Sequence, residues 1–234
     1  MFNLGNNSRH STSKATRAKQ KVERLGEERI NNQGCLMKVV EYNKAENIIV
    51  EFQDEYKGRV NSRYKDFIKG SIKNPYYPNV YGGMIGVKYP AKVNGKVSKE
   101  YFTWHNMLME CTDHVQETFC CKEWLLFENF YEWMHEQSNF DKFLNGNKWA
   151  LSKEIIKNNN VYSPDTCYLV SPKVKQLFIK QELNIYDVSE VVLKEYKEHK
   201  ERIIKRIAEE EFASGNITKE CYESMMDYEV DIIG

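Results

Sequence analysis

The stretch that decides the fold of this chain runs from Trp149 to Phe178 and reads WALSKEIIKNNNVYSPDTCYLVSPKVKQLF. The apolar run that ends at Leu151 predicts one strand, and the run that ends at Val170 predicts a second. A polar turn with three consecutive asparagines lies between them. After Pro172 the spacing of the apolar side chains predicts a short amphipathic helix. Strand, loop, strand and helix together form the skeleton of a ββα metal finger.

Two motifs upstream of this stretch occur in the same order in a known family. A helical segment reads W-x-x-M-x-x-x-C from Trp104 to Cys111, and the pair Cys120-Cys121 precedes Glu-Trp and an aromatic helix. With the finger segment, they make the chain resemble the phage HNH (His-Me finger) endonucleases of homing type. Many of those enzymes also carry an AP2 DNA-binding domain. The resemblance covers residues 24–170 and resumes in the last helices.

The resemblance also identifies the positions at which such enzymes cut DNA. They use a carboxylate that holds the metal, a general base beside it and a further ligand on the helix. In this chain the position of the metal-holding carboxylate corresponds to Ser152 and that of the base to Lys153. The family's strand-end amide position corresponds to Thr166, and the ligand position on the helix corresponds to Lys175. A protonated lysine cannot ligate a divalent cation and repels it, so no catalytic residue is expected. Glu154 is the candidate for a displaced ligand, and Mg²⁺ or Mn²⁺ is implied only if nuclease activity survives.

Composition limits the class of protein. The chain has 234 residues, no formal net charge and six scattered cysteines. No apolar run approaches the ~20 residues that a membrane-spanning helix needs, so we expect no membrane partner and a soluble protein of the bacterial cytoplasm. In a reducing compartment the cysteines are expected to be core residues or metal ligands rather than disulfides.

The chain is predicted to be an α+β protein with four parts. They are a basic flexible tail over 1–23, a β-rich module over 24–98, a degenerate finger-like domain over 99–182, and a C-terminal helical segment over 183–234. The clearest strand patterns cover 35–42 and 48–52, and helical periodicity covers 101–111, 122–137, 188–214 and 218–226. Only a short segment separates the finger from the last helices, so the AP2 domain is absent.

A basic, tyrosine-rich region lies within the β-rich module. Between Lys57 and Lys99 there are ten basic residues and one acid, with tyrosines interleaved. Basic groups neutralise phosphates and aromatic rings stack on bases, which favours contact with DNA or with a partner. A solvated sheet edge protected by lysines is the alternative. The candidate contact residues are Lys57, Arg59, Arg63, Lys65, Lys69 and Lys73.

Four cysteines occupy positions at which the resembled family also has cysteines. They are Cys111, Cys120, Cys121 and Cys167. The resemblance implies a structural zinc ion held by their thiolates with one imidazole, from His114 or His105. The spacing contains no C-x-x-C pair, so buried free cysteines are the alternative.

The sequence supports two candidate functions. The first is a phage or prophage binding protein that has lost catalysis, in its most concrete form an anti-CRISPR inhibitor of a host Cas nuclease. Its partner would be the Cas protein or its complex with guide RNA. The second is an HNH-type endonuclease or nickase that still binds and cuts DNA.

Overall fold

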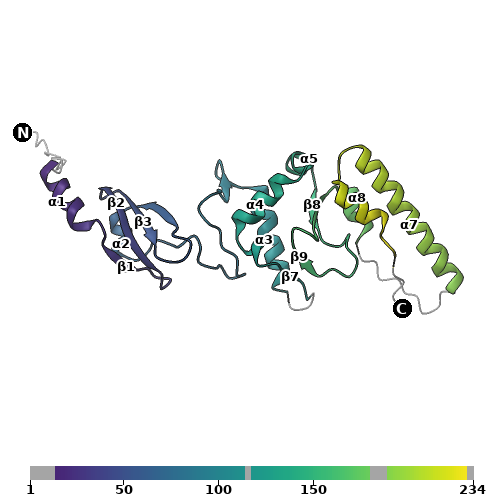
Figure 1. Cartoon of the computed structure of the whole chain (residues 1–234), viewed down its shortest axis with the longest axis horizontal. Coiled ribbons are helices and arrows are strands. Elements are labelled where there is room, and N and C mark those ends of the chain that lie inside the picture. The colour runs from purple at the N-terminus through teal and green to yellow at the C-terminus, as the bar shows by residue number, and fades with distance from the viewer. Residues whose placement is uncertain (1–13, 114–116, 180–188, 231–234) are drawn as a thin grey trace, which may run out of the picture. The chain divides into compact units, whose positions relative to one another are not determined.

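The computed structural model describes residues 14–113, 117–179 and 189–230 (Figure 1). The described residues form the α+β fold that the sequence predicts, with an N-terminal sheet and C-terminal helices. The chain divides into two compact units, one ending at Tyr77 and the other beginning at Pro78. Residues 78–98 therefore belong to the second unit, whereas the sequence pattern grouped them with the sheet. The last helices also belong to the second unit.

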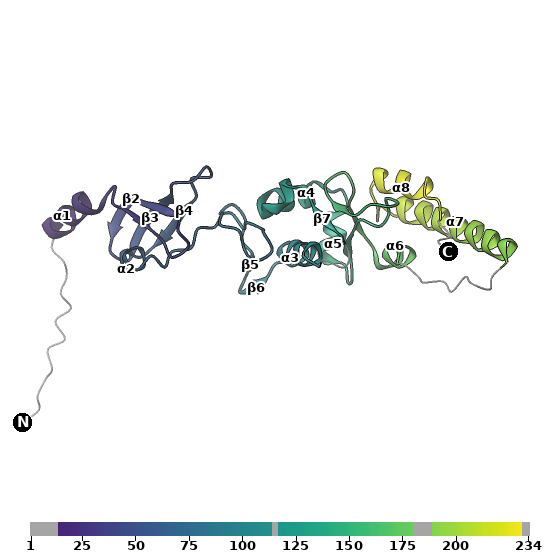
Figure 2. The ribbon, with the colours of Figure 1, turned by 90° about the horizontal axis from the view of Figure 1, so that it is seen from below.

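The N-terminal unit is an antiparallel meander in the order β1-β2-β3-β4, with one helix before it and one after it (Figures 1 and 2). Its elements are α1 (Lys14–Arg24), β1 (Glu28–Ile30), β2 (Leu36–Lys44), β3 (Asn47–Phe52), β4 (Arg59–Ser62) and α2 (Tyr64–Ile68).

Alternation of side chains builds the core of this unit. In β3, Ile48, Val50 and Phe52 are fully buried, while the residues between them are only partly covered. They pack with Val39 of β2 and with Phe67 of α2. A strand presents alternate residues to one face, so the two strand patterns are confirmed.

The segment predicted as a flexible tail is partly helical. Helix α1 covers residues 14–24, which contain neither glycine nor proline. At its end the Arg24 guanidinium lies 4.0 Å from the centroid of the Tyr64 ring of α2 and 5.3 Å from that of the Tyr42 ring of β2, and these cation–π contacts hold the helix to the unit. Residues 1–13 lie outside the described residues.

The C-terminal unit contains short strand pairs and most of the helices. Its elements are β5 (Lys92–Val93), β6 (Lys96–Val97), α3 (Lys99–Cys111), β7 (Phe119–Cys120), the 3₁₀ helix η1 (Glu123–Leu125), α4 (Phe127–Glu136), α5 (Phe140–Asn145), β8 (Ala150–Ser152), β9 (Val161–Tyr162), β10 (Tyr168–Val170), α6 (Pro172–Leu177), α7 (Glu190–Ala213) and α8 (Lys219–Met226).

An aromatic core joins α3 to α4. Trp104, Trp124, Phe127 and Phe130 are essentially inaccessible to solvent, and the Trp104 indole donates a 2.7 Å hydrogen bond to the Trp124 carbonyl. Because a buried indole N–H needs an acceptor, this bond sets the position of α3 against the segment before α4.

The helix predicted over residues 122–137 is interrupted. Leu126 is extended and forms a parallel bridge with Met84, whose backbone bonds to the Leu125 carbonyl and the Phe127 amide. The apolar periodicity continues through this position, so the interruption depends on a backbone partner that is distant in sequence. The prediction of one continuous helix was therefore wrong.

The C-terminal helices enclose a second core with α6. Their ends agree with the sequence pattern: the Thr218 hydroxyl accepts a bond from the Cys221 amide, and Gly215 has a φ of +62° just after α7. Helices α7 and α8 lie side by side in both views (Figures 1 and 2). Ile204, Ile207 and Met225 are among the residues buried between them.

The segment that begins at Trp149 contains the two predicted strands and the predicted helix, with an additional short strand between them. Strand β8 pairs antiparallel with β10, and α6 follows β10 and contacts both strands, whereas β9, which lies between β8 and β10 in sequence, pairs with β7. Whether this arrangement is a His-Me finger stays a prediction. Among the described residues, no helix is long and apolar enough to span a membrane.

Candidate functional site

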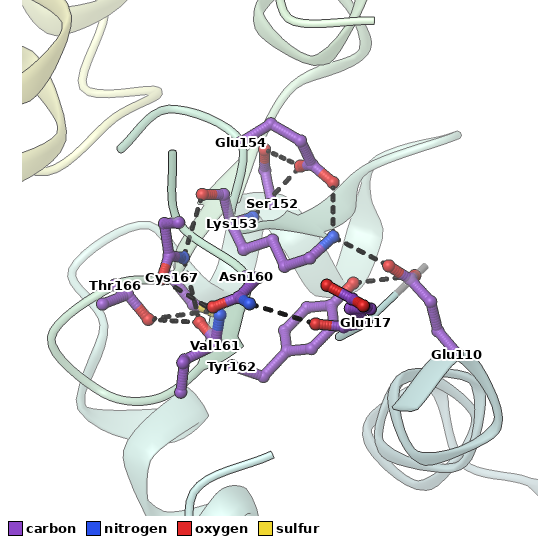
Figure 3. Close-up of polar contacts among 11 residues, drawn as sticks. Glu110, Glu117, Ser152, Lys153, Glu154, Asn160, Val161, Tyr162, Thr166 and Cys167 are labelled. Carbon is purple, nitrogen blue, oxygen red and sulfur yellow. Dashed lines mark hydrogen bonds and ion pairs between the residues drawn. The ribbon is translucent and has the colours of Figure 1, made fainter. Parts of the chain in front are cut away.

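A buried lysine lies at the position predicted for the catalytic base. Lys153 follows β8 and is only 7% exposed. Its ammonium lies between two carboxylates, 2.8 Å from Glu110 Oε1 on α3 and 3.1 Å from Glu154 Oε1 (Figure 3). A buried ammonium is stable only when it is paired, and here it has two acidic partners.

Backbone geometry at the end of β8 directs Glu154 toward this ammonium. The Ser152 hydroxyl donates a 2.8 Å hydrogen bond to Glu154 Oε2, and the Lys153 amide donates a 3.1 Å bond to the same oxygen. The carboxylate therefore folds back over its own strand end, and each of its oxygens has a partner.

Tyr162 completes the cluster from the side of β9. Its hydroxyl donates a 2.8 Å bond to Glu110 Oε2, and the Lys153 ammonium lies 4.9 Å from its ring centroid (Figure 3). Strand β9 pairs parallel with β7, so this tyrosine is held close to the cysteine pair that begins in β7. We call Glu110, Ser152, Lys153, Glu154 and Tyr162 the lysine cluster.

The charges of the lysine cluster reinforce one another. Burial opposes the charge on Lys153, but the bonds and charges of Glu110 and Glu154 outweigh it and raise the lysine pKa. Burial likewise opposes ionisation of Glu154, and the Ser152 and Lys153 contacts still lower its pKa. Burial and Glu110 raise the pKa of Tyr162. At neutral pH the lysine is a cation without a lone pair, so it can act neither as a base nor as a metal ligand.

The structure brings together only some of the predicted catalytic positions. Ser152, Lys153 and Glu154 are in contact, whereas the Thr166 hydroxyl bonds to the Val161 carbonyl and to Ser163. Lys175 is exposed on α6. Glu154 forms an ion pair with Lys153, and its role as a displaced metal ligand stays a prediction.

Sequence reasoning missed Glu110 and Tyr162 as members of the site. Glu110 directly precedes Cys111, three residues after the buried Met107, on a helix that was predicted. A lysine at a buried strand end needs an acidic partner from another element. This requirement was the signal in the sequence that could have pointed to an acid such as Glu110.

The four predicted cysteines do lie in one region of the C-terminal unit. Cys167 is 1% exposed in the aromatic core, and Cys111, Cys120 and Cys121 pack against that core. Burial raises the pKa of Cys167 to about 12 and that of Cys111 to about 11. Burial also raises the pKa of Cys120, and the other three cysteines add to that shift through their charges. These thiols are neutral at pH 7 in the absence of a cation.

The arrangement of these thiols does not form a ready metal site. In the part of the chain that the structure describes, no group of three His, Cys, Asp or Glu side chains is placed to hold a metal ion. The His105 ring packs edge-on against Tyr81 at a centroid distance of 5.1 Å, and His114 lies outside the described residues. A zinc ion would have to draw the thiolates together, so zinc stays a prediction.

We expect elemental analysis to find zinc in protein that has been purified without a chelator. If the cysteines hold it, a chelator will lower the melting temperature sharply, because the binding energy of a structural metal is part of the folding energy. Cys120→Ser should then lower the zinc content, and Cys221→Ser, a buried cysteine of the other core, should not. Metal-free wild-type protein would refute the prediction.

The six predicted contact residues are exposed on the N-terminal unit. They lie in β4, in α2 and in the adjoining loops, and they are Lys57, Arg59, Arg63, Lys65, Lys69 and Lys73. Arg59 pairs with Glu51 at 2.8 Å, and Arg63 pairs with Asp66 at 2.7 Å. The positive charge of these two arginines is therefore partly neutralised, whereas the lysines extend toward solvent.

Comparisons with known proteins give no relative for this chain. No protein-family model matches it, and neither a curated protein nor a solved structure shows significant similarity. The resemblance to phage HNH endonucleases therefore stays a prediction that is based on the sequence motifs.

Proposed function

We propose that this protein is a non-catalytic binding protein built on a nuclease-like scaffold. The observation that supports the proposal is the Lys153 ammonium between Glu110 and Glu154. A nuclease of this kind needs a divalent cation and a base at the end of this strand. Here the ammonium of Lys153, which stands at the predicted position of the base, pairs with the carboxylates of Glu110 and Glu154.

Electrostatic repulsion prevents the Lys153 ammonium and a bound metal ion from occupying the lysine cluster at the same time. A divalent ion entering the lysine cluster would face the buried Lys153 ammonium within about 3 Å of the same oxygens, and two cations at that separation repel each other. The raised pKa of Lys153 means that the lysine does not lose its proton near neutral pH to make room. The alternative of an HNH-type endonuclease or nickase requires Glu154 to be released from Ser152 and Lys153.

For the partner, we propose a host Cas nuclease, with the protein acting as an anti-CRISPR inhibitor. The motif resemblance to phage enzymes and the missing AP2 domain are the reasons for this choice. The basic N-terminal region and the acidic helices provide both signs of charge for docking on an enzyme that carries nucleic acid.

One plasmid assay tests both parts of the proposal. The purified protein alone should leave supercoiled plasmid intact with either Mg²⁺ or Mn²⁺. Added to a Cas nuclease loaded with its guide, it should block cleavage in a stoichiometric titration that is complete near equimolar protein, because a binding protein is not turned over.

Each of the two measurements has a result that would contradict the proposal. Metal-dependent nicking that Glu154→Ala abolishes would establish the endonuclease. Inhibition far below equimolar amounts would indicate an enzyme acting on the Cas complex. Undiminished Cas cleavage at a large excess of the protein would exclude that nuclease as the partner, without affecting the result for the protein alone.

A further inference from the structure

The two units of this chain carry opposite charge. Residues 1–77 contain 15 Lys and Arg against nine Asp and Glu, a formal charge of +6, and residues 78–234 contain 19 against 25, a formal charge of −6. The zero net charge of the whole chain conceals this division. A domain with an excess of cations attracts the phosphate backbone of nucleic acids without regard to sequence.

On the basic unit, two tyrosines form an exposed parallel stack. The rings of Tyr56 and Tyr76 lie 4.5 Å apart between centroids, with an angle of 2° between their planes. Tyr56 keeps 40% of its surface exposed, so it still has area that a flat ring can cover. Gly58 has no side chain at the place where a Cβ would approach the Tyr76 ring to 2.8 Å, which leaves room for that ring.

Two turn residues, the partly buried Asp54 and the buried Asn74, hold the stack in place. The Asp54 carboxylate accepts bonds from the Tyr56 and Lys57 amides, and the side-chain oxygen Oδ1 of Asn74 accepts one from the Tyr76 backbone amide. The Asn74 amide group in turn donates a 2.6 Å bond to Asp54. Both loops are therefore locked to each other before any ligand arrives, which reduces the entropy lost on binding.

Two exposed lysines lie close to the rings in sequence. Lys57 directly follows Tyr56, which the exposed Glu55 precedes, and Lys73 lies three residues before Tyr76. Aromatic faces for bases beside ammonium groups for phosphates are the combination that binds single strands. In a duplex the bases are already stacked on one another, so this surface suits an unpaired strand.

We propose that the Tyr56–Tyr76 stack is a binding site for single-stranded nucleic acid. A base stacks on the open face of Tyr56, extending the existing pair, while Lys57 and Lys73 neutralise neighbouring phosphates. The site recognises a nucleobase and a phosphate, which DNA and RNA share. It lies on the N-terminal unit and does not depend on what the lysine cluster does.

Fluorescence anisotropy with the full chain tests this site. The probes are labelled oligothymidylate and oligouridylate of about 15 nucleotides, the upper range for one such site, with a duplex of equal length as competitor. Tyr56→Ala should weaken single-strand binding about 5-fold to 150-fold, the loss that removing one stacking ring causes. Tyr56→Phe keeps the ring and should bind like the wild type.

Two matched controls separate stacking from general effects. Phe212 and Tyr222 form a second stacked pair, at 4.7 Å, in the acidic unit, and Phe212 is 42% exposed. Phe212→Ala should therefore leave binding unchanged. Lys57→Gln should lower the slope of log affinity against log salt by about 0.7, the value for one lost phosphate contact on a single strand. Lys122→Gln, at an exposed lysine of the acidic unit, should not change that slope.

Single-strand binding that Tyr56→Ala weakens supports the proposal with either probe. Oligothymidylate and oligouridylate differ both in the sugar and in the thymine methyl group, so unequal affinity would show that the site also contacts one of these two groups, and equal affinity would show that it contacts what the two probes share. Wild-type affinity in Tyr56→Ala, with an unchanged melting temperature, would overturn the proposal. Equally tight duplex binding would also overturn it. Absence of binding to either probe at low salt would do so as well, and would leave a protein partner for this surface.

Discussion

Lys153→Met is expected to lower the free energy of unfolding by about 3 kcal/mol, the lower end of the cost of breaking a buried ion pair. Methionine keeps most of the buried chain, so the loss reports the missing charge. Without the ammonium, the like charges of Glu110 and Glu154 are left without the cation that both contact. We choose the lower end because the side chains of Glu110 and Glu154 are 33% and 37% exposed, and water partly compensates them.

Urea unfolding at neutral pH measures this effect, and Lys175→Met is the matched control. Lys175 is the other lysine at a position matched to the catalytic site of the resembled enzymes, but it is exposed, so its substitution should change stability by less than about 0.5 kcal/mol. Adding Glu110→Gln and Glu154→Gln to Lys153→Met should recover part of the loss, because no uncompensated charge remains. Equal stability of the Lys153 and Lys175 variants would contradict the arrangement of the lysine cluster.

The pH dependence of this loss follows from the shifted pKa values. The Glu154 pKa is lowered from 4.5, so its contribution is present above that pH and is lost as the pH falls through the folded value. The Lys153 pKa is raised from 10.5, so its contribution is present below that pH and is lost only in strong alkali. In Lys153→Met the facing carboxylates protonate more readily, so the variant should approach wild-type stability as the pH falls toward 4.5.

Lys153→Ala is expected to turn the lysine cluster into a site for a divalent cation. Removal of the side chain leaves two carboxylates and the Ser152 hydroxyl around the space that the ammonium filled. Oxygen ligands of this kind suit Ca²⁺ and Mn²⁺, and Ca²⁺ tolerates irregular geometry. At an ion concentration about thirty times the dissociation constant, binding to the folded state alone would add about 2 kcal/mol of stability.

A thermal-shift titration with Ca²⁺ and Mn²⁺ measures this gain. A gain of about 2 kcal/mol should raise the melting temperature of Lys153→Ala by about 4–8 °C for a chain of this size. The wild type should not respond, since its own ammonium occupies the site. Lys153→Ala with Glu110→Gln should lose most of the response. Equal stabilisation of wild type and variant would show that the ion binds elsewhere, and no response in the variant would show that the ammonium does not stand in for a metal.

Local pattern determined much of this fold. The strand alternation of β2 and β3, the cap at Thr218, the glycine that ends α7 and the helix after Pro172 were all predictable. Each depends on residues within a few positions of one another, where periodicity, capping and allowed φ values act directly. The α+β class follows from those elements.

What tertiary structure alone decided involves partners that are distant in sequence. The break at Leu126 exists because Met84 supplies a backbone partner more than forty residues away, and no local pattern records it. The stack of Tyr56 on Tyr76 likewise depends on the bond between Asp54 and Asn74, which joins two separate loops.

The candidate site shows the same division. The sequence alone identified Ser152, Lys153 and Glu154 at a strand end, and it identified a lysine where a metal enzyme needs a base. It did not identify Glu110, because the face that α3 turns toward β8 is set by packing of the aromatic core. Burial decides what this lysine does: an exposed lysine is a solvated charge, whereas a buried one needs acidic partners from other elements.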